Sequence, residues 1–391
     1  MDYFKRSEEL FSETKENRRY LHKNAETGFE LPKTTEFVCE KLKSYGINPT
    51  PCGKGITATI GKGNPVILLR ADMDALPMKE ESGEKFASEN GNAHACGHDM
   101  HTAMLLTAAR MLKETETELM GTVKLMFQPA EELLLGSKNM IENKVLENPK
   151  PNAAIAFHTA AGKIPTGKFM YKKTSAMMSA VKMFRIETRG KGGHGAYPHL
   201  SVDALFILTK IYSAVSSLVS KEGNPDYKTF LTIGRMSSGT APNIIPETAF
   251  MEGSIRSDDN NEAERIFSRL KEVSEYIAKA FNGDVKVTLL SETPVLLCDE
   301  KITDLVVKVL SDKGFEGIAG MKAAASEDFS FIAEKIPSAM IYLSSGFSDE
   351  RGEYTAHNPK VVFDEEVLKI GAYAYAETAR RFLSENKNEV L

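Results

Sequence analysis

The stretch Asn92-Ala-His-Ala-Cys-Gly-His-Asp-Met-His-Thr102 contains three of the eight histidines of the chain and one of its four cysteines. Imidazole nitrogen and thiolate sulfur are ligands that divalent transition metals prefer, so these residues first indicate a metal site. The alternative is a polar loop in which Cys96 is buried as a small apolar residue. Apolar residues recur at helical spacing from Met104 to Leu112 and predict a helix over Asp99–Lys113, with the stretch at its N-terminus.

Three apolar runs around this stretch predict buried strands that end in polar side chains. They are Pro65–Leu69 before Asp72 and Asp74, Thr122–Phe127 before Glu131 and Glu132, and Ala153–Phe157 before His158. In α/β sheets, ligands and catalytic groups collect beyond the carboxyl ends of the strands. We therefore expect these polar side chains to converge with the stretch at 92–102.

The length of 391 residues predicts two domains or more. From Val181 onward, the pattern changes to the order strand, helix, strand, strand, helix, strand, which is typical of a ferredoxin-like unit. These elements are expected at Val181–Arg189, Val202–Val219, Thr229–Met236, Ala249–Ser257, Asn261–Phe281 and Val285–Leu290. We predict an inserted α+β domain at 182–291, and an α/β catalytic domain with a mixed sheet formed by 1–181 and 292–391.

Composition and charge narrow the class of protein. The chain has 42% apolar and 26% charged residues, as soluble globular proteins do. A formal net charge of -5 and a pI near 6.0 argue against nucleic acid as a partner. Four widely spaced cysteines do not resemble a disulfide framework, and the N-terminal segment has no apolar h-region. We expect a cytoplasmic protein without a membrane partner.

The separate signals for a hydrolytic metal site each have an ordinary alternative. Such a site needs His, thiolate or carboxylate ligands, an open position for water and a carboxylate that takes the proton of that water. In the pair Glu131-Glu132, one side chain can ligate while the other faces the water, although adjacent glutamates are more often a solvated surface. His158 and His357 could be ordinary histidines, and Asp72 and Asp74 could be a turn pair.

Seven motifs together give the chain a family resemblance. They are Arg70-Ala-Asp-Met-Asp-Ala-Leu-Pro, His94-Ala-Cys-Gly-His-Asp-Met-His, Phe127-Gln-Pro-Ala-Glu-Glu, Gly190-Lys-Gly-Gly-His-Gly-Ala-Tyr-Pro-His, Gly239-Thr-Ala-Pro-Asn-Ile-Ile-Pro, Ser326-Glu-Asp-Phe and His357-Asn-Pro. With these motifs the chain resembles the M20 metallopeptidases, and within them the amidohydrolase subfamily of auxin-conjugate amidohydrolases, hippurate hydrolases and N-acetyl-diaminopimelate deacetylases. The match spans nearly the whole chain.

The resemblance implies a dinuclear metallohydrolase. Two divalent ions per subunit, zinc or manganese with cobalt or nickel also accepted by such sites, would be held by Cys96, His98, Glu132, His158 and His357. Glu131 matches the general base, which acts on a water bridging the ions. Asp74 matches an acidic residue that orients the metal site. His94 and His101 are not ligands by this match and would support the ligands or cap the helix.

For the inserted domain, the resemblance implies a lid that also forms a homodimer. His194 matches a catalytic histidine that reaches the substrate carbonyl, in relatives often in the site of the partner subunit. Asn243 and Arg256 resemble residues that hold the substrate carboxylate, a task suited to the guanidinium fork. From the residues alone, Asn243 could equally be a turn residue and Arg256 a surface charge.

The expected activity is metal-dependent hydrolysis of the amide bond of a small molecule, an N-acyl or aminoacyl-conjugated amino acid. The alternatives are a dipeptidase or aminoacylase of another M20 branch, which more often has Asp in place of Cys96, and a non-catalytic metal-binding or ligand-binding protein. Two segments depart from the subfamily pattern: Leu133-Leu-Leu135-Gly136 replaces a glycine-rich stretch, and Thr159-Ala-Ala replaces a more polar run. These departures leave the substrate's acyl group open.

Overall fold

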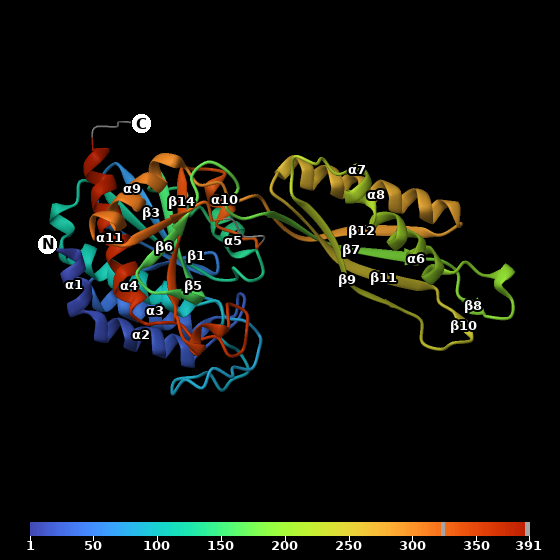
Figure 1. The fold of residues 1–391 in the computed structure, drawn as a ribbon, viewed down its shortest axis with the longest axis horizontal. Helices are drawn as coiled ribbons and strands as arrows, with labels where there is room; N and C mark the ends of the chain where they lie inside the picture. Colours follow the sequence, from blue (N-terminus) through green and yellow to red (C-terminus); the bar gives the residue numbers. More distant parts are fainter. Residues whose placement is uncertain (322–324, 388–391) are drawn as a thin grey trace. The chain divides into compact units, whose positions relative to one another are not determined.

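The computed structural model describes residues 1–321 and 325–387, and the chain divides into two compact units (Figure 1). The first unit contains Met1–Met177 and most of the chain after Leu297. The second contains Met178–Leu296 and a short segment that ends at Glu327. The insertion was expected at 182–291, so the compact second unit begins earlier and ends later than the hydrophobic pattern indicated.

A mixed sheet of eight strands forms the centre of the first unit, in the order β1-β2-β4-β3-β5-β14-β6-β13. The pairs β3–β4, β3–β5, β5–β14 and β6–β13 are parallel, whereas β1–β2, β2–β4 and β6–β14 are antiparallel. The strands are β1 (Thr50–Cys52), β2 (Gly55–Gly61), β3 (Val66–Asp72), β4 (Thr122–Gln128), β5 (Ala153–Pro165), β6 (Lys168–Tyr171), β13 (Glu316–Ala319) and β14 (Ser338–Gly346). The predicted mixed α/β fold is confirmed.

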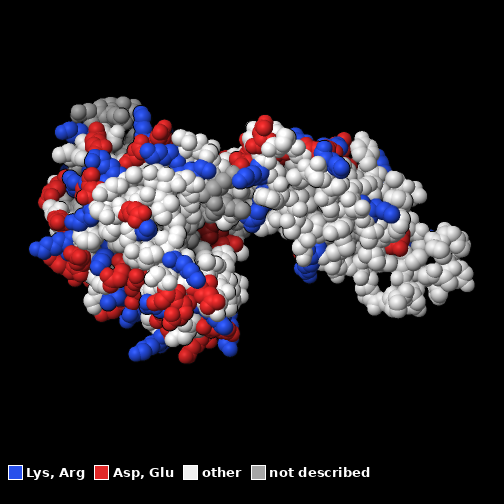
Figure 2. All heavy atoms as spheres, viewed as in Figure 1, with Lys and Arg blue, Asp and Glu red and all other residues white. Residues whose placement is uncertain are grey.

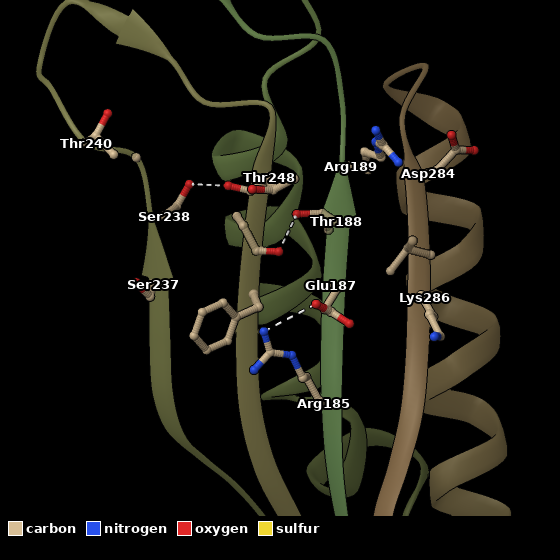
Figure 3. Close-up of a pocket in the computed structure, with 14 residues that line it drawn as sticks. Arg185, Glu187, Thr188, Arg189, Ser237, Ser238, Thr240, Thr248, Asp284 and Lys286 are labelled. Carbon is tan, nitrogen blue, oxygen red and sulfur yellow. Dashed lines mark hydrogen bonds and ion pairs between the residues drawn. The ribbon is translucent and has the colours of Figure 1, made fainter.

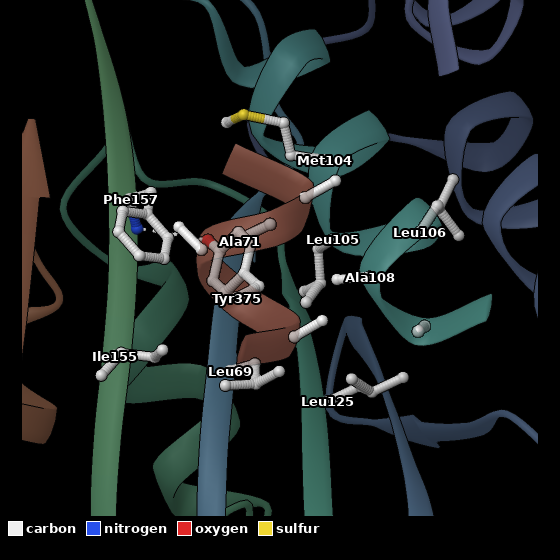
Figure 4. Close-up of a cluster of buried hydrophobic side chains, with 14 of the residues drawn as sticks. Leu69, Ala71, Met104, Leu105, Leu106, Ala108, Leu125, Ile155, Phe157 and Tyr375 are labelled. Atoms are coloured by element: carbon white, nitrogen blue, oxygen red, sulfur yellow. Dashed lines mark hydrogen bonds between the residues drawn. The ribbon is translucent and has the colours of Figure 1, made fainter. Parts of the chain in front are cut away.

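Helices α4 and α11 pack on each other and on β3, and their apolar faces form the core shown in Figure 4. Tyr375 of α11 lies within this core and its hydroxyl donates to the carbonyl oxygen of Arg70 at 2.6 Å, which ties the helix to β3. The helices of this unit are α1 (Tyr3–Glu9), α2 (Phe11–Lys23), α3 (Pro32–Ser44), α4 (His98–Glu114), α5 (Gly136–Glu142), α9 (Glu300–Asp312), α10 (Ser330–Ala333) and α11 (Val367–Glu385).

The register of the parallel strands aligns their carboxyl ends. In β3, Asp72 lies opposite Gln128 of β4, and Arg70 lies opposite Ala156 of β5. The segments that follow β3 and β4, and the part of β5 that contains His158, therefore lie beyond the same ends of these neighbouring inner strands. This is the convergence that the apolar runs predicted.

The second unit is an antiparallel sheet in the order β12-β7-β11-β9 with helices on one face (Figure 1). Its elements are β7 (Ala180–Arg189), α6 (Ala204–Val215), α7 (Leu218–Glu222), β9 (Thr229–Ser238), β11 (Thr248–Ser257), α8 (Asn260–Ala280) and β12 (Asp284–Thr293). This strand order confirms the ferredoxin-like topology. A two-stranded ribbon of β8 (Gly193–His194) and β10 (Ile244–Ile245) extends from the sheet and was not predicted.

Helices α6 and α7 lie within Ala204–Glu222, which among the described residues is the one helical segment long and apolar enough to cross a membrane. The buried residues Ile207, Leu208 and Ile211 of α6 pack in the core of the second unit, which accounts for part of this apolar composition. On the sheet face away from the helices, a groove of about 670 Å³ is lined by charged, small polar and apolar residues, among them Arg185, Glu187 and Lys286 (Figure 3). None of the expected substrate-binding residues lines it.

Candidate metal centre and active site

Five side chains that the sequence proposed as metal ligands gather in two groups that share one residue. The ligand atoms of Cys96, His98 and His158 lie within 4.8 Å of one another, and so do those of Cys96, Glu132 and His357. Cys96 is common to both groups, and its Sγ lies 3.6 Å from Nε2 of His158. The structure therefore brings together residues that are separated by as many as 261 positions in the chain (357 − 96).

Hydrogen bonds orient two of the histidines so that the same ring nitrogen faces the cluster. Nδ1 of His98 lies 2.8 Å from the carbonyl oxygen of Asp74, and Nδ1 of His158 lies 2.7 Å from the carbonyl oxygen of Thr159. A carbonyl oxygen can only accept, so each Nδ1 carries a proton, and in the neutral form of each ring Nε2 presents its lone pair. A hydrogen bond of this kind from the other ring nitrogen fixes the tautomer of a metal-binding histidine.

Two buried polar atoms of the cluster make no hydrogen bond of good geometry within the described chain: Nε2 of His98, and Oε1 of Glu132, which has only the ion-pair contact with Nε2 of His357 at 3.4 Å. Buried polar atoms are normally satisfied, and these two atoms, 4.0 Å apart with one in each ligand group, are in the positions expected of metal ligands. Burial also lowers the pKa of His158 well below its usual value, which keeps the imidazole neutral. Burial raises the pKa of the Cys96 thiol to about 12. A coordinated metal would lower this pKa, because it stabilises the thiolate. The residues present fit a metal site.

His101 lies beside the cluster but is oriented away from a ligand role. Its Nε2 accepts the backbone N–H of Thr159 at 2.8 Å, so its Nδ1 carries the proton and donates to Asp72. His94 is buried, and both of its ring nitrogens lack partners in the described chain. Neither histidine caps α4, because the N-cap is Gly97 and no side chain bonds the cap. The expectation that they could cap the helix is wrong.

The conformation of Gly97 sets the direction in which the chain enters α4. Its φ of 94° is one that residues with a side chain rarely adopt, and a Cβ at this position would lie 2.3 Å from Oγ1 of Thr159. The close approach places Cys96 and His98 on either side of the N-terminus of α4. The partial positive charge of a helix N-terminus favours a thiolate at Cys96.

The pair Glu131-Glu132 is held by one buried carboxylate. Asp74, only 1% exposed, accepts the backbone N–H of Glu131 at 2.9 Å and that of Glu132 at 3.2 Å. Ala130, just before the pair, has a φ of 53°, a strained value for a residue with a side chain. Glu131 is 6% exposed and its Oε2 lies 3.9 Å from Nε2 of His98. The alternative of a solvated surface pair is excluded.

His357 reaches the cluster from a strained backbone position. Its φ is 66°, its backbone N–H donates to the carbonyl oxygen of Ala95 at 2.9 Å, and its Nε2 lies 3.4 Å from Oε1 of Glu132. This contact raises the pKa of His357. Strained non-glycine residues occur most often at functional sites, where the surrounding structure holds them in place.

A buried network beneath the cluster was not identified from the sequence. Arg70 contacts Asp72 at 2.6 Å, Gln128 at 2.9 Å and Asp328 at 3.1 Å, and the backbone N–H of Ser137 donates to Asp328 at 2.9 Å. The network fixes Asp72, which holds His101 and lies 3.8 Å from Nε2 of His98. The available signal was an arginine at the end of an apolar strand, because a buried arginine requires acidic partners.

The second unit contains three residues that were expected to contact substrate. His194 and Asn243 lie together, and Arg256 lies apart from them. Asn243 is next to His194, because its carbonyl oxygen accepts the N–H of Gly195 at 2.9 Å. Nδ1 of His194 accepts the N–H of Ala196 at 3.0 Å, so Nε2 carries the proton of the neutral ring and is free to donate. Arg256 lies elsewhere: it is half-buried in β11 and donates to Oγ of Ser326 at 3.0 Å.

The distance between Arg256 and the ribbon that contains His194 follows from the register of the sheet. Arg256 lies opposite Val181 at the start of β7, whereas the ribbon with His194 follows Arg189 at the end of β7. Eight residues of strand span about 26 Å at 3.3 Å per residue. The second unit of one chain therefore brings Asn243 to His194 but does not bring Arg256 to either.

Comparisons with known proteins agree with this architecture. Residues 68–381 match the model of peptidase family M20/M25/M40. N-acetyl-L-cysteine deacetylase of Bacillus subtilis is 36% identical over 95% of this chain and 88% of its own length. Hippurate hydrolase of Campylobacter jejuni is 32% identical over 96% of this chain and 98% of its own length.

A solved structure supports the same relationship. A Bacillus subtilis protein described as a dinuclear metal binding peptidase of the M20 family superposes with a TM-score of 0.80 at 28% identity, covering 96% of this chain and 99% of that one. These matches confirm the resemblance that the seven motifs indicated. The chain belongs to peptidase family M20/M25/M40.

Proposed function

We propose that this protein is a metal-dependent amidohydrolase that cleaves the amide bond of N-acyl amino acids. The observation that carries the proposal is the convergence of the two groups of ligand-type side chains, with Nε2 of His98 buried and without a hydrogen bond in the described chain, beside the buried carboxylate of Glu131. A ligand set with a carboxylate next to it is the arrangement that metal-assisted hydrolysis requires. The names of the relatives, a deacetylase of N-acetyl-L-cysteine and a hippurate hydrolase, support an N-acyl amino acid as the substrate class.

Cys96, His98, Glu132, His158 and His357 would hold two divalent ions, which we propose to be zinc or manganese, with Cys96 between the two groups. Bound ions would supply Lewis acidity and lower the pKa of a water molecule in the site. Glu131 accepts the proton of the attacking water and transfers it to the leaving amine. Asp74 orients Glu131 through the backbone hydrogen bonds described above.

His194 and Asn243 complete the proposal from the second unit, which we propose to be a lid and dimerisation domain. The protonated Nε2 of His194 would donate to the substrate carbonyl oxygen as charge develops on it. Asn243 and Arg256 would hold the substrate carboxylate. Because Arg256 is about 26 Å along the sheet from the ribbon, one small substrate cannot contact Arg256 and His194 of the same chain. We therefore propose that His194 and Asn243 act in the site of the partner subunit.

Two surfaces of the second unit support a homodimer. Residues 192–201 and 239–246, around β8 and β10, contain no charged side chain, and the end of the second unit is correspondingly pale in Figure 2. Within them Tyr197 is 56% exposed and Leu200 is 60% exposed. Helix α6 exposes Leu205, Phe206 and Tyr212 on the side away from its own sheet. Exposed apolar groups of this kind are typical of protein interfaces.

Complementation tests action across the dimer. His194→Ala and Glu131→Gln each remove a different catalytic group, so each homodimer should be inactive. If His194 acts in the partner's site, a mixed dimer contains one site with both groups intact, and mixing should restore up to roughly a quarter of wild-type activity for statistical exchange between two sites. No recovery from a verified mixed dimer, or a monomer by light scattering, would contradict the proposal.

A substrate panel tests the activity. N-acetyl, N-benzoyl and N-succinyl amino acids are offered to apoprotein reconstituted separately with zinc, manganese, cobalt and nickel, and release of the free amino acid is measured. We expect release with at least one metal and none from apoprotein. Binding of these compounds by calorimetry without any product would contradict the proposed hydrolysis.

A cytoplasmic location is also proposed, in keeping with four cysteines that are all free.

A further inference from the structure

Two exposed leucines directly follow the Glu131-Glu132 pair. Leu133 is 49% exposed and Leu135 is 38% exposed, although both lie in the segment that leads from a catalytic carboxylate into α5. Single exposed apolar residues are ordinary on protein surfaces. Here two of them lie on one short turn, within four residues of the buried carboxylate of Glu131.

The turn that presents the leucines is fixed by backbone hydrogen bonds. The N–H of Leu134 donates to the backbone carbonyl oxygen of Glu131 at 2.7 Å, and those of Leu135 and Gly136 donate to the carbonyl oxygen of Ala130 at 3.3 and 3.2 Å. Leu134 has a φ of 59°, so the turn holds a strained conformation. The leucines are therefore held in defined positions relative to Glu131.

A neighbouring loop brings a glycine against the turn. A Cβ at Gly28 would lie 2.9 Å from Cδ1 of Leu133, and the carbonyl oxygen of Gly28 accepts the N–H of Ala130 at 3.0 Å. Leu133 thus packs against Gly28 and is still 49% exposed. A second apolar group follows another ligand: Ala160 lies two residues after His158 in β5 and points to the same face of the strand.

We propose that Leu133 and Leu135 bind an apolar substituent of the substrate, so that the enzyme prefers substrates with an extended hydrocarbon group over N-acetylalanine. The inference rests on the proposed function and specifies its substrate class. The substituent belongs either to the acyl group or to the amino-acid side chain, since both are attached to the amide that Glu131 serves. Succinyl and other charged substituents are disfavoured, because an apolar surface offers no hydrogen bond to a carboxylate.

Two substrate series distinguish the sources. In one, the acyl group on alanine lengthens from acetyl to octanoyl; in the other, the side chain of an N-acetyl amino acid lengthens from alanine to norleucine and phenylalanine. We expect kcat/KM to rise with apolar size in one series. Leu133→Ala and Leu135→Ala should each reduce the ratio of kcat/KM for the longest to the shortest substrate by roughly 10-fold.

Met120→Ala is the matched control, because Met120 is 50% exposed and precedes β4 at the end opposite Glu131. It should leave the ratio unchanged. If both leucine variants lose the rise of kcat/KM with apolar size in one series, the result supports the proposal and shows whether the substituent belongs to the acyl group or to the amino-acid side chain. Wild-type hydrolysis with no dependence on apolar size, or ratios unaffected by either variant, would overturn it while leaving the proposed function intact. Absence of wild-type hydrolysis of every compound would overturn the proposed function and this inference together.

Discussion

Asp74→Asn changes the side chain that orients both glutamates. The wild-type carboxylate accepts two backbone N–H groups, at 2.9 Å from Glu131 and 3.2 Å from Glu132. An amide has a single acceptor oxygen, so it can satisfy one N–H group and must turn its own NH2 group towards the other. The substitution is nearly isosteric, and the bond from Nδ1 of His98 to the carbonyl oxygen of residue 74 is unaffected.

The expected magnitude follows from the lost hydrogen bond. A buried hydrogen bond to a charged group contributes about 1.5 to 3 kcal/mol, so Asp74→Asn should reduce the free energy of unfolding by about 2 kcal/mol. Displacement of a catalytic group by about 1 Å can reduce turnover about 100-fold. Loss of a residue that orients ligands typically weakens metal binding by about 10- to 100-fold.

Metal titration with steady-state kinetics separates these effects. Excess metal should restore occupancy of Asp74→Asn but leave kcat about 100-fold below wild type, because Glu131 stays misplaced. Asp226→Asn, on an exposed loop of the second unit, is the control and should behave as wild type. A kcat within twofold of wild type at full occupancy would refute the claim that Asp74 positions the base.

Three further predictions concern the metal and a buried histidine. Cys96→Ala should lower the metal content per chain, measured by elemental analysis, because both ligand groups lose a member; unchanged content would contradict its role. Chelation should abolish activity reversibly and lower Tm, since a ligand that binds only the native state stabilises it; an unchanged Tm would argue against a bound ion. His22 bonds Asp99 at 2.8 Å and Glu80 at 2.9 Å. Burial alone would lower the pKa of His22, but these carboxylates raise it above its value of about 6.5 in the unfolded chain. The contribution of protonated His22 to the free energy of unfolding is therefore complete below this unfolded pKa, and it is lost as the pH rises through the raised pKa of the folded state. His22→Gln should therefore lower the free energy of unfolding by about 2 kcal/mol at pH 6 and by less at pH 9, as measured by urea unfolding; equal destabilisation at both pH values would contradict this.

Much of the fold was predictable because its signals are local. The seven residues of β3 are all buried, and a continuous apolar run is the mark of such a strand. The second unit alternates regular elements whose order alone identifies its topology. Other features depend on distant partners: β5 extends to Pro165 because it pairs with β14, well beyond the apolar run that ended at Phe157. The ribbon of β8 and β10 has only two residues per strand, too few for any periodicity.

The site was predictable in its members but not in their roles. Spacing alone made His101 as good a candidate ligand as His98, since both are in one stretch. The N–H of Thr159, 58 residues further along, decides the tautomer of His101. Similarly, Arg70 meets Asp328 across 258 residues, and the distance between Arg256 and His194 depends on strand register. Side-chain direction and tautomer follow from tertiary contacts, which a single sequence does not contain.

A comparison of wild type and Glu131→Gln, with metal content and turnover measured on the same preparations, separates the role of Glu131 from that of the ligands. We expect about two ions per chain in both proteins, because Glu131 is not among the five proposed ligands. We expect turnover of an N-acyl amino acid to fall at least about 100-fold in Glu131→Gln, within the contribution typical of a general base. Retained turnover in the variant, or loss of its metal, would contradict metal-dependent hydrolysis with Glu131 as the base.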